Sequence, residues 1–226
     1  MIKYEIQGDT LPVVVCYPEQ GETLKTEKGA MSWMSPNMKM KTNTGGGGVF
    51  GRIFTGETIF MNEYTAENGP GMIAFASSFP GSILPYHVTP GNDLIVQKRG
   101  FLAMESGLTL GVAFQKKFGA GLFGGEGFIM QRISGDGLVF VEIDGACIKK
   151  ELQPGEQLIV DTGFIAAYTG NCSIDVQMVK GVKNILFGGE GLFNTVVTGP
   201  GTVWLQSMPI YSVARAIQPH IVVGSK

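Results

Sequence analysis

The sequence predicts an all-β protein built from three tandem β-sandwich-like repeats of about 65 residues, arranged around a pseudo-threefold axis. Glycine accounts for 34 of the 226 residues and follows no Gly-X-Y period, which is typical of many tight turns rather than of collagen. The segment LFGGEG occurs at 122–127 and again at 186–191, and PGNDLIV at 90–96 is followed by PGEQLIV at 154–160. Both pairs are 64 residues apart, which indicates a repeating unit of that length.

The repeats are predicted to form a single compact unit over residues 1–226, with a C-terminal tail over 210–226. A unit of about 65 residues buries little apolar surface alone, whereas three packed units share a core and cover one another's sheet edges. Three like units suggest the pseudo-threefold arrangement. In the tail, residues 212–216 are predicted to form one or two helical turns. The predicted repeats span about 11–75, 83–144 and 147–207.

In the first repeat, three apolar runs are predicted to be strands. Residues 29–34 begin at a glycine, residues 38–42 alternate between methionine and lysine, and residues 72–75 follow Gly69-Pro70-Gly71. The alternation over 38–42 is typical of a strand with one face in solvent. The glycines and prolines between these runs indicate turns.

The second and third repeats carry matching strands and turns. Pro90-Gly91 and its counterpart Pro154-Gly155 fit the central positions of a type II turn, where proline fixes φ and glycine accepts a positive φ. Two predicted strands in these repeats begin at a glycine, and two follow a Gly-x-Gly. They are 100–104 and 163–167, then 138–141 and 202–205.

Charge and composition exclude two classes of protein. The chain has 17 Lys and Arg against 19 Asp and Glu and a pI of about 5.7, so it lacks the basic excess of a dedicated nucleic-acid binder. Its apolar content of 44% is too high for a disordered chain. We therefore expect a folded protein that binds no nucleic acid and whose partners are copies of itself or other proteins.

Cysteine usage and the N-terminal segment favour a cytoplasmic protein. Cys16, Cys147 and Cys172 are odd in number and widely spaced, which is typical of buried thiols in a reducing compartment. Residues 1–10 contain no apolar stretch of the kind found in a signal peptide. No run of 18 apolar residues predicts an integral membrane segment.

Residues suited to catalysis are scarce. The two histidines, His87 and His220, form no metal-binding motif and are expected to be surface imidazoles. Residues 119–124 fit G-x-G-x-x-G, but no helix pattern follows, so we interpret them as a glycine-rich hairpin or loop rather than a dinucleotide site. The sequence thus predicts no catalytic residue, no metal site, no cofactor and no enzymatic activity.

Three glutamates are candidate ligand-binding residues. Glu57, Glu126 and Glu190 each follow a glycine ahead of the Gly-x-Gly of a repeat. Around a pseudo-threefold axis, such carboxylates could form a ring that binds a cation. The alternative is that each is a solvated carboxylate in a turn. Glu57 also stands at a different spacing from its Gly-x-Gly than the other two.

Four phenylalanines are candidate interface residues. Phe123 and Phe128 accompany the first LFGGEG segment, and Phe187 and Phe193 accompany the second. If these hairpins are exposed, their apolar side chains form a patch suited to a subunit interface. Peripheral membrane contact is less favoured because no basic cluster accompanies the patch. The alternative is that the hairpins pack between the repeats.

Several motifs resemble one bacterial family. They are Gly21-Glu22, Gly56-Glu57-Thr58-Ile59-Phe60, Phe79-Pro80-Gly81 and, as the most specific, residues 198–207 with the sequence TGPGTVWLQS. Over essentially the whole chain, the sequence resembles the bacterial family related to the yeast altered-inheritance-of-mitochondria protein, formerly a domain-of-unknown-function family. The resemblance implies a TRAP-like fold, similar to the tryptophan RNA-binding attenuation protein, with no established enzymatic activity. Fold likeness to an RNA binder does not imply RNA binding.

These observations favour a non-enzymatic structural or protein-interaction scaffold that self-associates as a homo-oligomer. The alternative is a small-ligand or ion-binding module. Its site would lie between repeats or at the pseudo-axis, with Glu126 and Glu190 as polar contacts.

Overall fold

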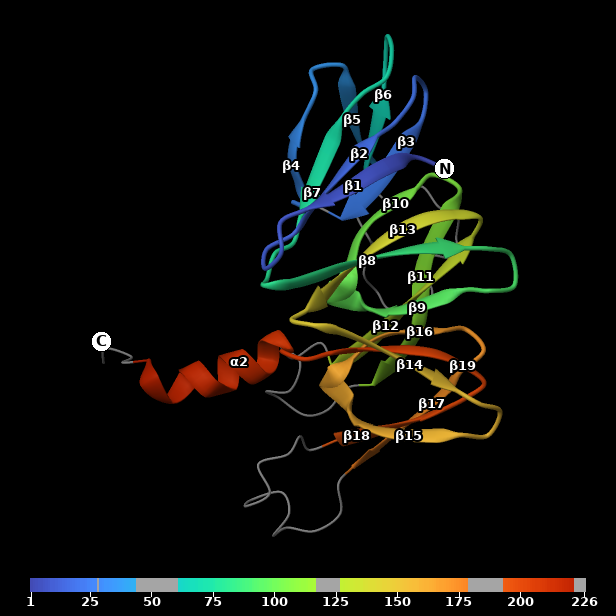
Figure 1. The fold of residues 1–226 in the computed structure, drawn as a ribbon, viewed down its shortest axis with the longest axis vertical. Coiled ribbons are helices and arrows are strands. Elements are labelled where there is room, and N and C mark those ends of the chain that lie inside the picture. The colour runs from blue at the N-terminus through green and yellow to red at the C-terminus, as the bar shows by residue number, and fades with distance from the viewer. Residues whose placement is uncertain (28, 44–60, 117–126, 179–192, 222–226) are drawn as a thin grey trace.

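The fold is given by a computed structural model that describes residues 1–27, 29–43, 61–116, 127–178 and 193–221 (Figure 1). Within these ranges the chain is mostly β, in antiparallel sheets, with a single α-helix. The all-β class predicted from the sequence is therefore confirmed.

The strands fall into three groups of six, preceded by β1 (Lys3–Gln7). The first group is β2 (Val13–Tyr17), β3 (Thr23–Glu27), β4 (Met31–Met34), β5 (Met38–Asn43), β6 (Met61–Ala66) and β7 (Ile73–Ala76). The second is β8 (Gly81–Val88), β9 (Leu94–Gln97), β10 (Phe101–Glu105), β11 (Leu108–Lys116), β12 (Phe128–Gly135) and β13 (Gly137–Asp144). The third is β14 (Cys147–Leu152), β15 (Gln157–Asp161), β16 (Ile165–Thr169), β17 (Ser173–Met178), β18 (Phe193–Thr198) and β19 (Gly201–Gln206).

Strand pairing follows one pattern that recurs in all three groups. The first and third strands of a group both pair with its sixth strand, as β8 and β10 pair with β13. The second and fourth strands both pair with the fifth, as β9 and β11 pair with β12. The corresponding pairs hold in the first group and in the third. Residues that take the same place in this pattern are called counterparts below.

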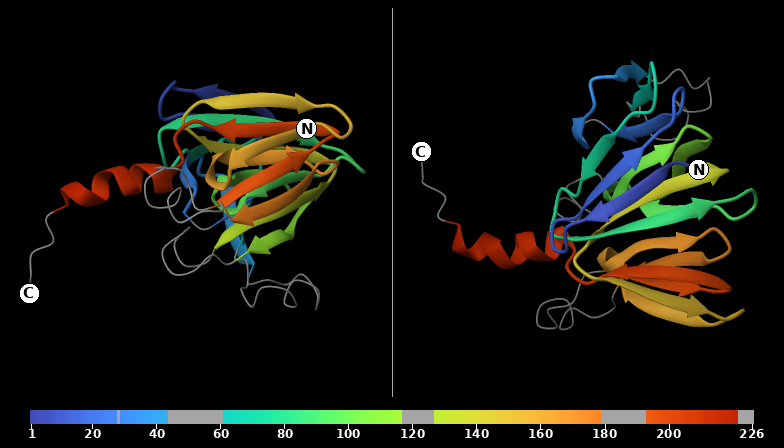
Figure 2. Two further views of the ribbon diagram at one scale, coloured as in Figure 1. Left: turned by 90° about the horizontal axis from the view of Figure 1, so that it is seen from below. Right: turned by 45° about the horizontal axis from the view of Figure 1, so that its top comes forward.

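Neighbouring groups are joined by two further antiparallel pairs, β3 with β10 and β9 with β16. These pairs produce two six-stranded sheets of the same construction, β5-β6-β3-β10-β13-β8 and β11-β12-β9-β16-β19-β14. A four-stranded sheet, β1-β2-β7-β4, remains in the first group, and a three-stranded sheet, β15-β18-β17, remains in the third. Figures 1 and 2 show the three groups stacked one after another along the long axis.

This series differs from the predicted pseudo-threefold arrangement. A closed threefold would need a strand pair that returns from the third group to the first, and the described strands form no such pair. The two strands that would make it, β4 and β15, lie toward opposite ends of the molecule (Figure 1). The physical reason is that the strand pairs between groups join only groups that follow one another in the chain, β3 with β10 and β9 with β16.

A hydrogen bond recurs at the Gly-x-Gly turn of each group. The residue after the second glycine donates its backbone N–H to a side chain at the end of the third strand. The pairs are Met72 with Ser35 at 2.9 Å, Leu138 with Glu105 at 2.7 Å and Thr202 with Thr169 at 3.1 Å. The two segments approach closely, since a Cβ on Gly201 would lie 2.4 Å from Oγ1 of Thr169. This contact excludes a side chain at Gly137 and Gly201, whereas at Gly71 the space is taken by Met38 and Ala66.

The core consists of three apolar clusters, each drawn from two neighbouring groups. The first includes Phe75 of β7 and Phe140 of β13. The second includes Val139 of β13 and Trp204 of β19. In the third cluster, residues of β12 pack together with residues of β16. The core therefore extends across both boundaries between neighbouring groups.

The tail forms the helix α2 (Ile210–Ile217), which includes the predicted helical turns at 212–216, followed by the 3-10 helix η4 (Gln218–His220). No residue of α2 is buried, and the helix extends away from the sheets (Figures 1 and 2).

Gly91 and Gly155 have φ values of +82° and +79°, which the predicted type II turns require. Among the described residues, no helix has the length and apolar character needed to cross a bilayer.

Candidate functional site

Most of the predicted site residues lie outside the part of the chain that the structure describes. These are Glu57, Glu126, Glu190, Phe123 and Phe187, and the predictions made for them stay predictions. Phe128, in β12, is only 1% exposed and belongs to the third apolar cluster. Phe193, in β18, packs against the same cluster. Both side chains thus contribute to the core, and an interface role for them stays a prediction.

The histidines and cysteines lie apart from one another. His87 Nε2 is 3.2 Å from Asp136 Oδ1 at the surface, and His220 is exposed in η4. The three cysteines are free thiols, and burial raises the pKa of the Cys16 thiol to about 12, which makes it unreactive near neutral pH. The described residues contain no cluster of three or more His, Cys, Asp or Glu side chains placed to hold a metal ion.

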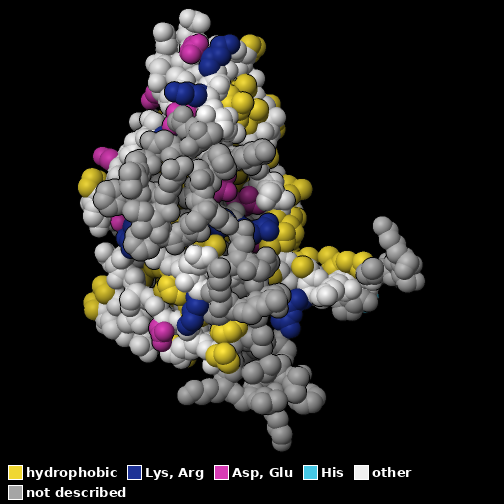
Figure 3. Space-filling model, turned by 180° about the vertical axis from the view of Figure 1, so that it is seen from behind, with side chains coloured by type: hydrophobic (Ala, Val, Ile, Leu, Met, Phe, Trp, Pro, Cys, Tyr) yellow, Lys and Arg dark blue, Asp and Glu magenta, His cyan; other side chains and the backbone are white. Residues whose placement is uncertain are grey.

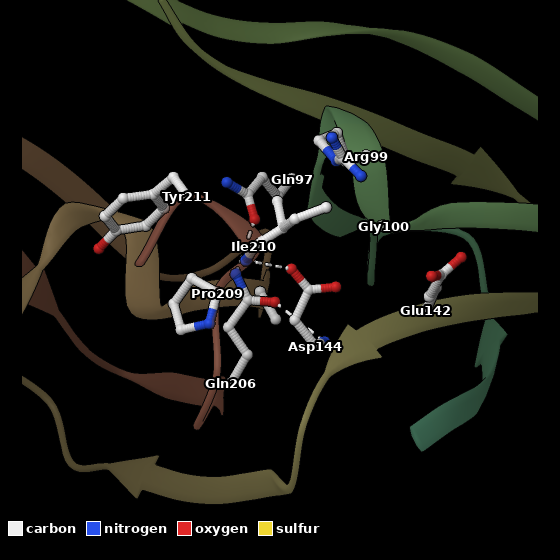
Figure 4. Close-up of a pocket in the computed structure, with 10 residues that line it drawn as sticks. Gln97, Arg99, Gly100, Glu142, Asp144, Gln206, Pro209, Ile210 and Tyr211 are labelled. Atoms are coloured by element: carbon white, nitrogen blue, oxygen red, sulfur yellow. Dashed lines mark hydrogen bonds between the residues drawn. The ribbon is translucent and has the colours of Figure 1, made fainter. Parts of the chain in front are cut away.

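A polar pocket lies between the second and third groups, at the base of α2 (Figure 4). Its charged and polar lining comes from Arg99 in the 3-10 helix η1 (Lys98–Gly100), Glu142 and Asp144 in β13, Gln206 in β19 and Tyr211 in α2. We call this set the junction pocket. None of these residues was predicted as a site residue, because they are spread over more than 100 positions of the sequence and form no recognisable catalytic or binding motif.

Asp144 fixes the start of α2. Its Oδ2 accepts a hydrogen bond from the backbone N–H of Ile210 at 2.9 Å, which is the favourable place for a carboxylate at a helix N-terminus. Burial raises the pKa of the Asp144 carboxyl, while the Ile210 N–H and the positive charge of Arg99 act in the opposite direction. The carboxylate thus attaches the projecting helix to the end of β13.

Glu142 holds the linker between β7 and β8. Its side chain is almost fully buried, and Oε1 accepts hydrogen bonds from the Ser78 N–H at 2.9 Å, the Ser78 hydroxyl at 2.8 Å and the Phe79 N–H at 3.0 Å. Burial raises the pKa of Glu142, these hydrogen bonds lower it, and the nearby charge of Asp144 raises it further. The carboxyl therefore serves mainly as an acceptor for backbone and hydroxyl groups.

Gln206 is the counterpart of Glu142 one group later. Its Oε1 accepts the backbone N–H of Asp144 at 3.2 Å, and its Nε2 donates to Gln97 Oε1 at 3.0 Å and to the Gly163 carbonyl at 2.7 Å. Glu142 thus holds the linker that enters its own group, whereas Gln206 bonds to the last residue of β13, next to the linker that enters the third group. The junction pocket is a small cavity of about 20 Å³, enough for one or two water molecules. The polar groups that line it form hydrogen bonds with one another and connect β13, β19 and the start of α2.

A second feature is found at the two ends of the molecule, where β4 and β15 each have one edge that no described strand pairs with. Ile159 in β15 is 68% exposed, whereas its counterpart Ile95 in β9 is 1% exposed. Trp33 in β4 is 45% exposed, whereas its counterpart Ala103 in β10 is fully buried. The repeat PGNDLIV and PGEQLIV already relates Ile159 to Ile95, so comparison of the repeats was the signal that could have found this edge.

The other edge strands carry features that discourage pairing with another chain. Charged side chains and proline on an edge strand have this effect. By contrast, β4 has neither, and β15 has only Asp161, at its end. The edge residues concerned are Lys3 and Glu5 in β1, Lys39 and Lys41 in β5, Pro85 in β8, Lys116 in β11, Lys149 and Lys150 in β14, and Asp175 in β17.

Comparisons with known proteins agree with the overall fold. A family model described as mitochondrial biogenesis AIM24 matches residues 4–208. The crystal structure of protein SPYM3_0169 from Streptococcus pyogenes, a structural genomics target, superposes with a TM-score of 0.80 at 22% sequence identity. The match covers 98% of this chain and 100% of that one. Among curated proteins there is no significant match. The likeness to the tryptophan RNA-binding attenuation protein stays a prediction.

Proposed function

The chain belongs to the mitochondrial biogenesis AIM24 family, and from the two open sheet edges of its fold we propose that it is a non-enzymatic scaffold that self-associates head to tail. In this proposal β15 of one copy pairs with β4 of the next. The observation that supports it is that β4 and β15 each pair with one described strand, whereas their counterparts β10 and β9 are paired on both sides.

The two incomplete sheets complement each other. Both six-stranded sheets are built in the same order. The fourth, fifth and second strands of one group come first, and the third, sixth and first strands of the next group follow. The third group ends the chain with β17-β18-β15, which is the first half of this order. The first group contributes β4-β7-β2, which is the second half, extended by β1. Joining them between two copies gives a sheet of the same construction.

The internal pairs also define a register for the proposed contact. Ala103 pairs with Thr26 between β10 and β3, and Ala167 pairs with Val96 between β16 and β9. The counterparts of these pairs place Trp33 of one copy opposite Val160 of the other. The neighbouring pair is then Met34 opposite Ile159, which corresponds to Tyr168 opposite Ile95.

Exposed apolar side chains supply a driving force. Burial of a side chain such as Ile159 contributes about 1.5–3 kcal/mol. Met40 in β5 is 54% exposed, whereas its counterparts Leu110 and Ile174 pack against the apolar clusters that they share with neighbouring groups. A second copy placed next to the first group would give Met40 the same kind of neighbour. The contact is heterologous, so it generates either a closed ring or an open filament.

Three repeats in one compact unit, and a cytoplasmic location, are parts of this proposal. The recurring strand pairing supports the repeats at about 11–75, 83–144 and 147–207. The alternative of a small-ligand or ion-binding module has its best described location in the junction pocket. That cavity holds one or two water molecules, and its polar groups already bond to one another, so the scaffold is the better-supported function.

Mass measurement tests the proposal. We expect light scattering to give a multiple of the chain mass of 24.2 kDa for the wild type and 24.2 kDa for Ile159→Lys, because a lysine on this edge opposes pairing. Ile148→Lys is the matched control, since Ile148 is 43% exposed on β14, an edge that already carries two lysines. A wild-type protein that stays at 24.2 kDa over roughly 1–100 μM contradicts the proposal. So does an Ile159→Lys variant that keeps the wild-type mass.

A further inference from the structure

We propose that the start of α2 belongs to the docking surface for the second copy, with Tyr211 filling the place that Arg99 fills at the junction inside the chain. This inference rests on the proposed head-to-tail assembly. It identifies the element that sets the strength of that contact.

Position 163 lacks the side chain that its counterpart has. Arg99 in η1 and Gly163 in the 3-10 helix η3 (Thr162–Phe164) are 64 residues apart and occupy the same place in successive groups. The Arg99 side chain lies in the junction pocket, over the start of α2 (Figure 4). At Gly163, a Cβ would lie only 1.9 Å from Cε1 of Tyr211. The aromatic ring therefore occupies the space that a side chain at position 163 would take.

Tyr211 also holds the end of the edge strand. Its hydroxyl donates to Oδ1 of Asp161, the last residue of β15, at 3.1 Å. Asp161 Oδ1 also accepts the Gly163 N–H at 3.3 Å. Since Asp144 fixes Ile210, the first turn of α2 connects the end of β13 to the end of β15.

The internal junction indicates why β15 needs this support. Gln97, the counterpart of Asp161, receives a hydrogen bond from Gln206 in the sixth strand of the following group. In a second copy, the residue at the place of Gln206 is Ala76 of β7, whose side chain cannot donate a hydrogen bond. Asp161 instead receives its side-chain hydrogen bond from Tyr211 of its own chain. The helix thus fixes the strand end before a second copy binds.

The rest of α2 lies outside this contact. No residue of the helix is buried, and Ile217 is 51% exposed. Figure 3, seen from behind, shows the helix projecting from the body with hydrophobic side chains along one side. Changes beyond the first turn are therefore expected to leave the docking surface intact.

The test compares assembly affinity with the stability of a single copy. We expect Tyr211→Ala to raise the dissociation constant of the assembly about tenfold, measured by sedimentation across a dilution series. Tyr211→Phe keeps the ring and loses one hydrogen bond, and we expect a smaller rise of about twofold to fivefold. Ile217→Ala, on the same helix, is the matched control and keeps the wild-type constant.

Measurements in the Ile159→Lys background separate this inference from the scaffold proposal. There we expect Tyr211→Ala to speed hydrogen exchange in β15 and to leave the melting temperature within a few degrees of its parent. An unchanged dissociation constant for Tyr211→Ala overturns the role of α2 and leaves the scaffold standing. A loss of affinity matched by an equal loss of stability in that background also overturns it, since Tyr211 would then serve only the fold. The scaffold proposal itself is decided by other measurements, the masses of the wild type and of Ile159→Lys.

Discussion

Glu142 and Gln206 occupy the same place in successive groups, and each accepts backbone N–H groups at or next to the linker that enters its group. One side chain is a carboxyl and the other an amide, so the position requires a hydrogen-bond acceptor and not a charge. A charged side chain buried here loses hydration that three hydrogen bonds compensate only in part, which is why the pKa of Glu142 is raised. The carboxyl therefore contributes to folding most strongly when it is protonated.

This leads to a prediction about pH. Because the pKa of Glu142 in the folded state lies above its usual value of 4.5, its contribution to stability is complete at lower pH and is lost as pH rises through the folded-state pKa. Glu142→Gln keeps the Oε1 acceptor and cannot ionise. We expect the variant to gain stability relative to the wild type as pH rises from about 4 to 8 in urea unfolding. An identical pH profile for both proteins contradicts this account.

Removing the acceptor gives the contrasting result. We expect Glu142→Ala to lower the free energy of unfolding in urea by about 1–3 kcal/mol near pH 4, because the N–H groups of Ser78 and Phe79 lose their side-chain acceptor. The loss is expected to be smaller at higher pH, where the wild-type carboxyl contributes less.

At the scale of elements, the Gly-x-Gly turns show how the repeat is encoded. The turn places the start of the sixth strand against the end of the third, where one hydrogen bond recurs in each group. Gly201 has a φ of +149° and leaves no room for a side chain, because Thr169 and Cys172 lie against it. The glycine is thus fixed by tertiary contact as well as by backbone conformation.

Two glycine substitutions separate these causes. We expect Gly201→Ala to lower stability by about 2–4 kcal/mol, since a Cβ there would lie 2.4 Å from Thr169 Oγ1 and 2.6 Å from Cys172 Sγ. Gly155→Ala is the control, because Gly155 has a positive φ with no atom within 4 Å of its Cβ position, and it should cost about 1–2 kcal/mol. Equal losses of melting temperature for the two variants would show that backbone strain alone matters.

The alternating pattern at residues 38–42 predicted a strand correctly but not which of its side chains are buried. β5 covers Met38–Asn43 as expected, and Met38 is buried. Met40, on the face that the alternation assigns to the core, is 54% exposed. The alternation defines which side chains share a face, whereas burial depends on what packs over that face, and among the described residues Met40 stays more than half exposed.

At the scale of the whole molecule, the arrangement of three groups in a row leaves one incomplete sheet at each end. Within a single chain, the second group pairs with a neighbouring group on both sides, through β10 with β3 and through β9 with β16. The first and third groups each lack one neighbour. The proposed head-to-tail association would give the first and third groups the second neighbour that they lack in a single chain.

Tryptophan fluorescence follows this association directly. Trp204 is 5% exposed and packs edge-on against Tyr86, whereas Trp33 is 45% exposed on β4. In a Trp204→Phe background, Trp33 is the sole tryptophan. We expect its emission to shift to shorter wavelength as concentration rises, and to stay unshifted when Ile159→Lys is added. A spectrum that does not change with concentration, in a sample that light scattering shows to be assembled, would place the contact elsewhere.

The sequence alone determined the all-β class, the positions of the main turns and the 64-residue relation between segments, because turn residues and apolar patterns are local signals. The tertiary structure decided how the groups are arranged. The strand pairs between groups run in an open series, and this left Trp33 and Ile159 exposed while their counterparts are buried. It also brought Arg99, Glu142 and Tyr211 into one pocket. Pairing partners and burial arise from contacts between distant segments, and one strand's sequence does not specify which neighbour it receives.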